Sequence, residues 1–255
     1  MKVLVTGAAG FLGRGLIIPF EEHGHTLRLM DVAEFSSPRH EVVVGDVSNY
    51  DQVERAVQGM EGIVIAHMAS RGPEDINYKT PQMAFDINVK GTAFLFHAAV
   101  KCGVRRVVVI SSGPTIWDQT EVGPNWDRKQ PFRTWGGYYI LSKSIQEVIA
   151  EHFARTEKLA VACLRPAYIA DGEANVDKYG RQIGERNFQD TDRRDIGEVA
   201  RLCLERTDST YECFTVMSTP ESLEKADVRY TCERLGWKQR YDFTWLPKAE
   251  EKKPN

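Results

Sequence analysis

The sequence predicts an α/β protein: a doubly wound parallel sheet with a small C-terminal lobe. Two observations lead to this fold class. Strand-like and helix-like stretches alternate from the first residues onward, which is typical of a parallel sheet covered by helices on both faces. A glycine-rich turn at Gly7, Gly10 and Gly13 joins the first of these strands to the first helix. At 255 residues the chain is long enough for one such unit with a small appendage.

Composition narrows the class of protein. The chain is 42% apolar and 27% charged with a net charge of −3, which is ordinary for a soluble globular protein and gives no sign of a nucleic-acid or membrane surface. The N-terminus enters a strand directly, without the pattern of a signal peptide, and no run of apolar residues is long enough to span a membrane. The five cysteines are odd in number and widely spaced, so we expect reduced thiols and no metal site. These features predict a cytoplasmic protein with a small-molecule substrate and neither a nucleic-acid nor a membrane partner.

The first element is a β-branched and aliphatic strand over residues 2–6, followed by a helix whose apolar positions begin at Leu12. The start of a helix presents unpaired backbone N–H groups and partial positive charge, so this loop suits a pyrophosphate. In this interpretation Gly7 allows the tight turn, Gly10 the approach of the phosphate, and Gly13 the packing of helix on strand. The motif predicts a Rossmann-type dinucleotide site whose loop residues are Gly7, Gly10, Phe11, Leu12 and Gly13.

A second strand over residues 25–30 ends at Asp31. An acidic residue about 20 positions after such a loop is where a ribose hydroxyl would be held. A carboxylate there would also repel a 2′-phosphate, so the sequence favours NAD over NADP. The alternative is that Asp31 only caps the end of its strand.

The remaining elements follow the same alternation up to residue 110. A third strand is expected over 41–45 after too short a connection for a full crossover helix. A short helix over 51–58 leads to a fourth strand over 62–67. One long helix is expected over 80–101, closed by Gly103, and an almost unbroken apolar run over 104–110 predicts a central fifth strand.

Beyond the fifth strand the pattern is interrupted twice. Residues 115–135 are rich in Pro, Gly, Trp and charge and are expected to form a surface loop over the site. A second long helix over 138–156 and a sixth strand over 159–164 follow, and periodicity then weakens until residue 192. The last elements expected are a helix over 195–205, a strand over 211–217 and a helix over 222–235. The expected units are therefore a nucleotide-binding domain of residues 1–166 plus about 207–218, and a lobe of about 167–206 and 219–255.

The candidate chemistry lies on the helix over 138–156. Tyr139 and Lys143 are four residues apart, so both side chains lie on one face, one turn apart. An unperturbed phenol holds its proton too tightly to act as a base at neutral pH, but a fixed ammonium one turn away favours the phenolate. Ser111 or Ser112, at the carboxyl end of the fifth strand, would orient a substrate oxygen, and we favour Ser112 because it lies further past the sheet edge.

Taken together, these motifs resemble those of the extended short-chain dehydrogenase/reductases, the NAD-dependent epimerase/dehydratase family. The resemblance is carried in unbroken order over about residues 1–170 by TGAAGFLG, Asp31, GDV, AHMAS, NVKGT, VVVISS, YYILSK and LRP. It implies that Ser112, Tyr139 and Lys143 are catalytic, with Lys143 also contacting the nicotinamide ribose. The further residues that it implies for cofactor binding are Asp46, Val47, His67, Ala69, Asn88, Ser111, Pro166, Ala167 and Tyr168.

Within that family the compact length and the LGW segment at 235–237 are closest in outline to uronate dehydrogenases, which oxidise a free sugar acid with NAD. Two features depart from the pattern: Thr115-Ile116-Trp117 replaces the usual V-Y-G, and Gly113-Pro114 replaces a polar pair. The resemblance therefore implies an NAD-dependent oxidoreductase of carbohydrate metabolism that acts on a hydroxyl or carbonyl of a small polyhydroxylated substrate, a sugar or sugar acid.

Two other functions remain open: a nucleotide-sugar epimerase or dehydratase that retains NAD, and a non-catalytic NAD(H)-binding regulatory protein. Substrate choice is expected to depend on residues 113–135 and 167–192. The candidate substrate contacts are Arg71, Ser112, Gly113 and Arg165, although Arg165 fits a structural ion pair equally well. His67 is open between a proton relay and a satisfied structural histidine. Pairing of the helices over 80–101 and 138–156 would give a homodimer.

Overall fold

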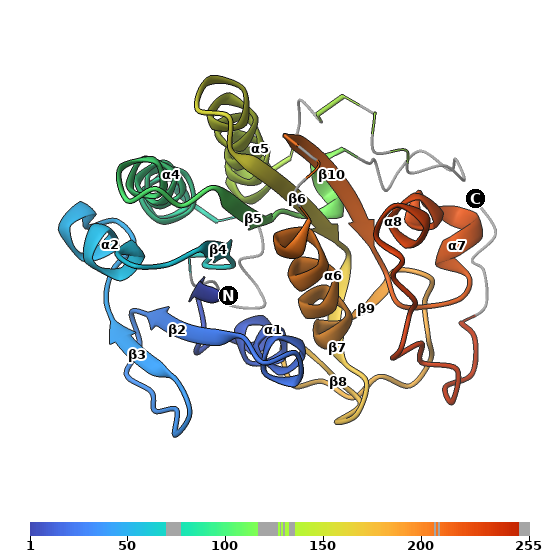
Figure 1. Ribbon diagram of the computed structural model, residues 1–255. Helices are drawn as coiled ribbons and strands as arrows, with labels where there is room; N and C mark the ends of the chain where they lie inside the picture. The colour runs from blue at the N-terminus through green and yellow to red at the C-terminus, as the bar shows by residue number, and fades with distance from the viewer. Residues whose placement is uncertain are drawn as a thin grey trace.

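The protein is built on a seven-stranded parallel sheet (Figure 1). The computed structural model describes residues 1–69, 78–116, 127, 129, 131–132, 136–206, 208 and 210–249. The strands lie in the order β10-β6-β5-β4-β1-β2-β3. Their bounds are β1 (Lys2–Thr6), β2 (Thr26–Asp31), β3 (Glu41–Val44), β4 (Gly62–Ile65), β5 (Arg106–Ile110), β6 (Ala160–Pro166) and β10 (Tyr211–Val216). The order reverses direction between β1 and β4, as in other doubly wound sheets, so the predicted fold class is confirmed.

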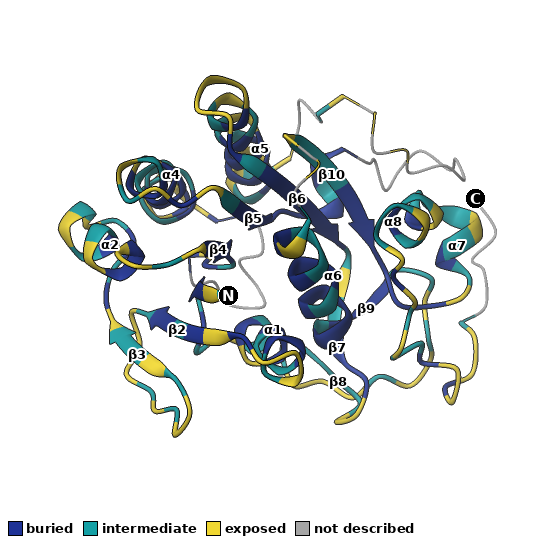
Figure 2. Cartoon of the chain, in the orientation of Figure 1, coloured by how far each residue is buried: buried dark blue, intermediate teal, exposed yellow. Residues whose placement is uncertain are grey.

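Helices cover both faces of this sheet (Figure 1). Successive side chains of a strand point to opposite faces, so Val3 and Val5 enter one buried cluster while Leu4 enters the other. The helices on the Val3 face are α1 (Phe11–Glu22), α6 (Arg193–Glu205) and α8 (Val228–Leu235). Those on the Leu4 face are α2 (Tyr50–Val57), α4 (Gly91–Lys101) and α5 (Tyr138–Thr156). The central strands are therefore the buried middle layer, which Figure 2 shows mostly in dark blue, while the edge strand β3 is intermediate or exposed.

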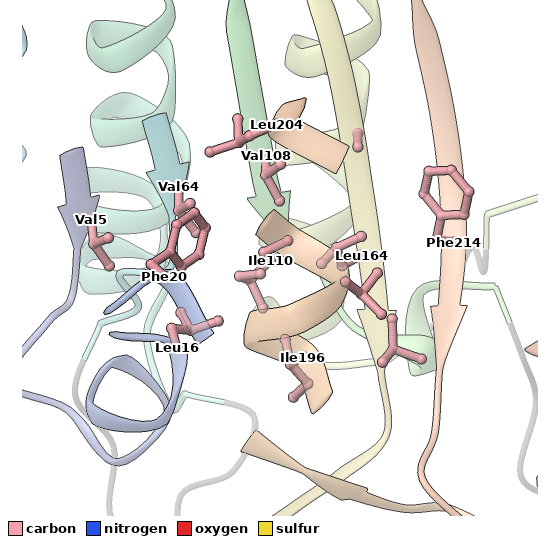
Figure 3. Packing of buried hydrophobic residues seen from close by; sticks show 14 of the residues in the cluster. Val5, Leu16, Phe20, Val64, Val108, Ile110, Leu164, Ile196, Leu204 and Phe214 are labelled. Carbon is pink, nitrogen blue, oxygen red and sulfur yellow. The ribbon is translucent and has the colours of Figure 1, made fainter. Parts of the chain in front are cut away.

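Helices α1 and α6 approach each other closely on the Val3 face. A Cβ on Gly197 would lie 3.0 Å from the Cα of Leu16, so the two backbones approach closely there. Figure 3 shows Leu16 and Phe20 of α1 and Ile196 of α6 packed beside the strands. Helix α6 thus packs on the sheet next to α1, and the proposed division of the chain into a nucleotide-binding domain and a lobe stays a prediction.

All seven strands end at the same edge of the sheet, because the pairing is parallel throughout. In register, Thr6 pairs with Ile65, Ile65 pairs with Val109, and Ile110 pairs with Leu164. The segments that follow these strands therefore come together, and ligands of open α/β sheets bind at this carboxyl edge.

The predicted helix over 80–101 is one continuous helical run in three parts. It comprises α3 (Pro81–Met83), a π-helical segment η1 (Ala84–Lys90) and α4, with Gly103 in the left-handed region (φ 76°) just after its end. Single π-helical turns occur preferentially at functional sites. In this protein the π-helical segment carries Asn88, which is fully buried.

Past β6 the chain forms a second, three-stranded sheet that the sequence did not predict. Its strands are β7 (Tyr168–Asp171), β8 (Val176–Asp177) and β9 (Asp190–Asp192). With two to four residues each, these strands are too short to show a period of two in the sequence. The remaining short elements are the 3-10 turn η2 (Gly113–Thr115) and helix α7 (Ser222–Lys225).

The expected single helix over 222–235 is wrong. It is two helices, α7 and α8, separated at Ala226, whose backbone is extended. Leu223 and Val228 both pack into the same core cluster. Five positions apart, they would point to different sides of one continuous helix, and the break lets both face the core. Among the described residues, no helix combines the length and apolar character needed to cross a membrane.

Candidate active site

The loop between β1 and α1 has the tight geometry expected of a phosphate-binding turn. Gly7 has φ 71°, and a Cβ there would lie 2.8 Å from the Cα of His67. A Cβ on Gly13 would lie 2.2 Å from the carbonyl oxygen of Gly7, so only glycine lets α1 pack this closely on the loop. Gly10 is the N-cap of α1 and has no side chain with which to cap the helix. The backbone N–H groups of the first turn, with their partial positive charge, are therefore left for a ligand.

Asp31 lies beside this loop at the end of β2. Its Oδ2 accepts a hydrogen bond from the Ala9 backbone N–H at 3.0 Å, and its Oδ1 accepts one from Ala33 N–H at 3.0 Å. The carboxylate thus supports the loop and also caps the strand end, and its expected ribose contact stays a prediction. A carboxylate oxygen can accept more than one hydrogen bond, so these contacts leave it able to hold a ribose hydroxyl.

Asp46 and Val47 follow β3 at the same edge. Asp46 Oδ1 accepts from Ser48 N–H at 2.8 Å, and its own N–H donates to Gln52 Oε1 at 2.7 Å. Val47 is buried, and its Cγ2 lies 2.8 Å from the position a Cβ on Gly91 would take. This segment is therefore held in place by its own turn and by the start of α4.

His67 is a satisfied structural histidine. Its Nε2 donates to the Ile87 carbonyl oxygen at 3.0 Å, so that nitrogen carries the proton, and Nδ1 accepts from Thr6 Oγ1 at 3.0 Å. Burial, together with the positive charge of Lys143, lowers the pKa of His67 to about 3. A histidine that stays neutral with both nitrogens bonded does not relay protons, which resolves the alternative left open by the sequence.

Asn88 joins the segment that follows β4 to the start of α5. Its Oδ1 accepts from Ala69 N–H at 2.8 Å, and its Nδ2 donates to Ser142 Oγ at 2.9 Å. Ser142 Oγ in turn donates to the carbonyl oxygen of Tyr139 at 2.9 Å. This buried chain of hydrogen bonds fixes the backbone that carries Tyr139.

Tyr78 is a neighbour of Tyr139 that the sequence reasoning missed. Its hydroxyl donates to the Ala69 carbonyl oxygen at 2.6 Å, and its ring centroid lies 6.4 Å from that of Tyr139. It is buried and has φ 58°, a costly conformation for an aromatic residue. No sequence motif pointed to Tyr78. Its position beside Tyr139 depends on a left-handed backbone conformation, which glycine or asparagine adopts more readily than tyrosine.

Lys143 places this turn of α5 against the fifth strand. Its Nζ donates to the carbonyl oxygen of Ile110 at 2.8 Å, and the residue is 3% exposed. Ile110 is the last residue of β5 and directly precedes the two serines. Tyr139 lies one turn earlier on α5 and is partly buried. The structure therefore brings the Tyr139–Lys143 turn to the strand end that carries Ser112.

The two serines have different surroundings. The Ser111 hydroxyl donates to the buried carboxylate of Glu147, so this side chain is held by the fold, and its expected part in cofactor binding stays a prediction. Ser112 follows at the strand end, where its carbonyl oxygen accepts from Thr115 Oγ1 at 2.8 Å. Gly113 opens a 3-10 turn, in which the backbone N–H of Thr115 also donates to the Ser112 carbonyl oxygen at 3.1 Å. The part of Ser112 in orienting a substrate oxygen stays a prediction.

Arg165 forms a buried ion pair rather than a free substrate contact. Its Nη2 lies 2.6 Å from Glu147 Oε2 and its Nε 2.9 Å from Glu147 Oε1, with both side chains at most 5% exposed. Burial would lower the pKa of Arg165, but its hydrogen bonds to Glu147 outweigh that effect and raise it. The structural alternative weighed for Arg165 is therefore the one observed.

Of the other residues expected at the site, some lie at the end of β6 and some lie outside the described residues. Pro166 ends β6, Ala167 N–H donates to Thr191 Oγ1 at 3.3 Å, and Tyr168 begins β7 with 55% of its surface exposed. These three residues lie at the end of β6 and just after it, at the edge where the glycine loop and Ser112 lie. The expected substrate residue Arg71 lies outside the described residues, as does Trp117 of the surface loop.

Arg193 is a second residue that the sequence reasoning missed. Its Nη1 donates to the Phe11 carbonyl oxygen at 3.1 Å, its guanidinium carbon lies 4.8 Å from the Phe11 ring centroid, and its Nη2 pairs with Asp171. Asp171 ends β7, so this arginine connects the small sheet to the nucleotide loop. Only the fold brings residues so distant in the sequence together.

Comparison with known proteins gives a family match and several relatives. Residues 3–205 match the NAD dependent epimerase/dehydratase family. Among curated relatives, a uronate dehydrogenase of Pseudomonas syringae pv. tomato is 32% identical over 158 residues, which are 60% of this chain and 54% of that protein. A 3-beta-hydroxysteroid dehydrogenase of Mycolicibacterium neoaurum is 33% identical over 160 residues, which are 60% of this chain and 42% of that protein. The match thus spans about half or less of these relatives' length.

Solved structures show the same fold at lower identity. A uronate dehydrogenase from Agrobacterium tumefaciens, a mutant form complexed with NAD, has TM-score 0.74 at 24% identity and covers 95% of this chain and 85% of its own. MoeE5 in complex with UDP-glucuronic acid and NAD has TM-score 0.75 at 19% identity and covers 96% of this chain and 98% of its own. The fold of the whole chain is therefore shared with these proteins.

Proposed function

This chain belongs to the NAD dependent epimerase/dehydratase family, and from that premise we propose that it is an NAD-dependent oxidoreductase of the extended short-chain type. We further propose that it acts on a hydroxyl or carbonyl of a small polyhydroxylated substrate, a sugar or sugar acid, within carbohydrate metabolism. Support comes from the uronate dehydrogenases among its sequence relatives and structural neighbours.

The nucleotide-binding residues fit NAD. Gly7 and Gly13 leave no room for a side chain in the loop, so the backbone N–H groups at the start of α1, on Phe11 and Leu12, would hold the pyrophosphate. Asp31 would hold the adenosine ribose. The other residues proposed to line the cofactor are Gly10, Asp46, Val47, His67, Ala69, Asn88, Tyr139, Lys143, Pro166, Ala167 and Tyr168. When bound, NAD supplies the hydride acceptor.

The chain's own residues would handle the proton. Tyr139, as phenolate, takes the proton of the substrate hydroxyl, and Ser112 donates a hydrogen bond that orients the same oxygen. The ammonium of Lys143 stabilises the phenolate and binds the nicotinamide ribose. Since Lys143 is also hydrogen-bonded to Ile110, its charge is fixed next to Tyr139 before the substrate enters.

The single observation that carries this proposal is the hydrogen bond from Lys143 to the end of β5, which brings the tyrosine–lysine turn to Ser112. The experiment is a panel of sugars, sugar acids and simple alcohols, incubated with NAD and followed by NADH absorbance. We expect turnover with at least one sugar or sugar acid. A protein that binds NAD but turns over nothing in the panel would instead favour a non-catalytic NAD(H)-binding regulatory role.

A second candidate is an epimerase or dehydratase that keeps its cofactor, since a UDP-glucose-4-epimerase from Stenotrophomonas maltophila with bound NAD has the same fold (TM-score 0.76). Such an enzyme returns the hydride to its product. NAD that stays with the purified protein, together with substrate conversion without net NADH, would favour this second function over the dehydrogenase.

Cofactor choice is tested at Asp31. Removing its negative charge with Asp31→Asn should improve use of NADP relative to NAD by about tenfold or more, because the carboxylate no longer repels a 2′-phosphate. The readout is the ratio of kcat/KM for the two cofactors. Asp51→Asn, an exposed change on α2, is the matched control and should leave the ratio unchanged. An unchanged ratio in Asp31→Asn would contradict the ribose assignment.

We also propose a cytoplasmic homodimer. The five cysteines are free thiols, which suits a reducing compartment.

Leu141 and Val148 on α5 are each about half exposed, and Met83 before α4 is 50% exposed, so these helices offer an apolar surface to a second copy. Light scattering after size exclusion should give a mass twice that of the chain, and Leu141→Lys should lower it to the monomer value.

A further inference from the structure

A pair of cysteines lies on the α5 face of the sheet, beside Glu147, the carboxylate that also accepts the Ser111 hydroxyl. Cys163 on β6 and Cys213 on β10 are directly paired in the parallel register. Neighbouring strands lie about 4.8 Å apart, and paired residues of a parallel sheet point to the same face. Both side chains accordingly join the cluster on the α5 face, and their Sγ atoms and a Glu147 carboxylate oxygen all lie within 4.8 Å of one another.

The surroundings of this pair are polar and charged. Cys213 Sγ lies 3.7 Å from Glu147 Oε2 and 3.4 Å from the hydroxyl oxygen of Tyr211. Arg165 binds both carboxylate oxygens of Glu147 at the same place. A guanidinium that already occupies the carboxylate opposes a divalent cation, and its positive charge offsets the negative charge that Glu147 places beside Cys213. The chemistry of the cluster is therefore that of a reactive dithiol rather than of a metal site.

We propose that Cys163 and Cys213 are a modification site: a dithiol that a peroxide oxidises to an intramolecular disulfide. A disulfide requires Cα atoms about 4.4–6.8 Å apart, a range that includes the spacing of directly paired strands. Cys213 lies on β10, the edge strand of the sheet, which can adjust to the bond without disturbing a second neighbour. Cys213 is partly exposed while Cys163 is fully buried, so the oxidant reaches Cys213 first.

The reaction balances with hydrogen peroxide as the oxidant. The Cys213 thiolate attacks one peroxide oxygen, the O–O bond breaks, and the leaving hydroxide takes up a proton to give water and a sulfenic acid. The Cys163 sulfur then attacks the Cys213 sulfur, the S–O bond breaks, and hydroxide leaves with the Cys163 proton as a second water. The two sulfurs together lose two electrons, and the peroxide accepts them as it is reduced to two waters.

The pKa values of the two thiols differ in the direction that an attacking and a resolving thiol require. The hydrogen bond with Cys163 holds the pKa of the Cys213 thiol below its usual value, although burial and the negative charge of Glu147 act in the opposite direction. Burial raises the pKa of the Cys163 thiol well above its usual value. Cys213 is therefore the attacking thiolate and Cys163 the resolving thiol.

The test is to treat the folded, full-length protein with graded hydrogen peroxide, block the remaining thiols with N-ethylmaleimide under denaturing conditions, and map peptides by mass spectrometry. We expect two of the five cysteines to escape alkylation, with the loss of two hydrogen atoms from the intact mass. The expected product is a Cys163–Cys213 cross-linked peptide that disappears after dithiothreitol.

Two variants make the result decisive. Cys213→Ser should abolish the cross-link and leave Cys163 fully alkylated, while Cys102→Ser, in a cysteine outside the cluster, should leave the cross-link unchanged. Because serine is close to isosteric with cysteine, both variants should fold. The proposal would be overturned by sulfinic acid at Cys213 beside an unmodified Cys163, by cross-links that involve only the other cysteines, or by no oxidation at either position.

Discussion

At the scale of single residues, the site depends on buried polar contacts around Tyr139 that no short motif encodes. Tyr78 donates to Ala69 and lies beside the Tyr139 ring, while Asn88 and Ser142 hold the Tyr139 backbone. Each group in this chain is buried or partly buried, so each lost partner leaves a polar atom without water to replace it. Ordinary hydrogen bonds therefore fix the Tyr139 backbone and, with it, the position of the phenol.

Tyr78→Phe tests this support with a single-atom change. Removing the hydroxyl leaves the Ala69 carbonyl oxygen without this donor in a buried place, which should lower the free energy of unfolding by about 1 kcal/mol. Urea titration measures the change. Tyr168→Phe, at a residue with 55% of its surface exposed, is the control and should be neutral. Equal stability of Tyr78→Phe and the unchanged protein would show that the hydroxyl contributes nothing.

At the scale of elements, the position of α1 against β1 decides whether the loop can hold a nucleotide. Gly13→Ala places a Cβ 2.2 Å from the Gly7 oxygen and 2.7 Å from the Ala8 Cα, both backbone atoms that cannot move aside alone. The helix must shift, so we expect a loss of about 1–3 kcal/mol in stability and at least about tenfold weaker NAD binding.

Calorimetric titration with NAD measures the second effect, and Gly184→Ala is the matched control because a Cβ there meets nothing within 4 Å. Undiminished NAD affinity in Gly13→Ala would mean that the nucleotide does not use this loop.

At the scale of the whole molecule, buried carboxyl groups tie stability to pH. Asp195 at the start of α6 is fully buried, and burial raises its pKa from 3.8 to about 6 although the backbone N–H groups of Arg240 and Tyr241 act against the shift. A carboxyl whose pKa is raised by folding contributes stability that is fully present below its unfolded pKa. That stability is lost as the pH rises through the folded pKa.

Asp195→Asn removes this titration. The unfolding free energy of the variant minus that of the unchanged protein should rise by on the order of 2 kcal/mol from about pH 4.5 to about pH 7.5. The reason is that only the unchanged protein must bury a carboxylate at the higher pH. Urea titrations at the two pH values give the difference, and the exposed change Asp51→Asn should show almost none of it. A difference that does not vary with pH in Asp195→Asn would refute the burial argument.

The parts of this molecule that sequence could predict are those set by local pattern. The apolar run before Ser111, the glycine spacing and the four-residue interval between Tyr139 and Lys143 each have a fixed geometric meaning, so the sheet and the helix Tyr138–Thr156 follow from them. The break at Ala226 and the strands of the small sheet depend on which surfaces the rest of the fold leaves to be covered. The contacts of Tyr78 and Arg193 depend on chain segments that meet only after folding.

The central claim is that the Tyr139 phenol, held by α5 beside Lys143 and Ser112, carries the substrate proton. The most direct measurement is the turnover of Tyr139→Phe with the best substrate from the panel, together with the NAD dissociation constant of the same variant. The account predicts a fall in kcat of about 10²- to 10⁴-fold with NAD affinity nearly unchanged, because only the proton-transferring oxygen is lost. A variant that turns over at the rate of the unchanged enzyme would contradict it.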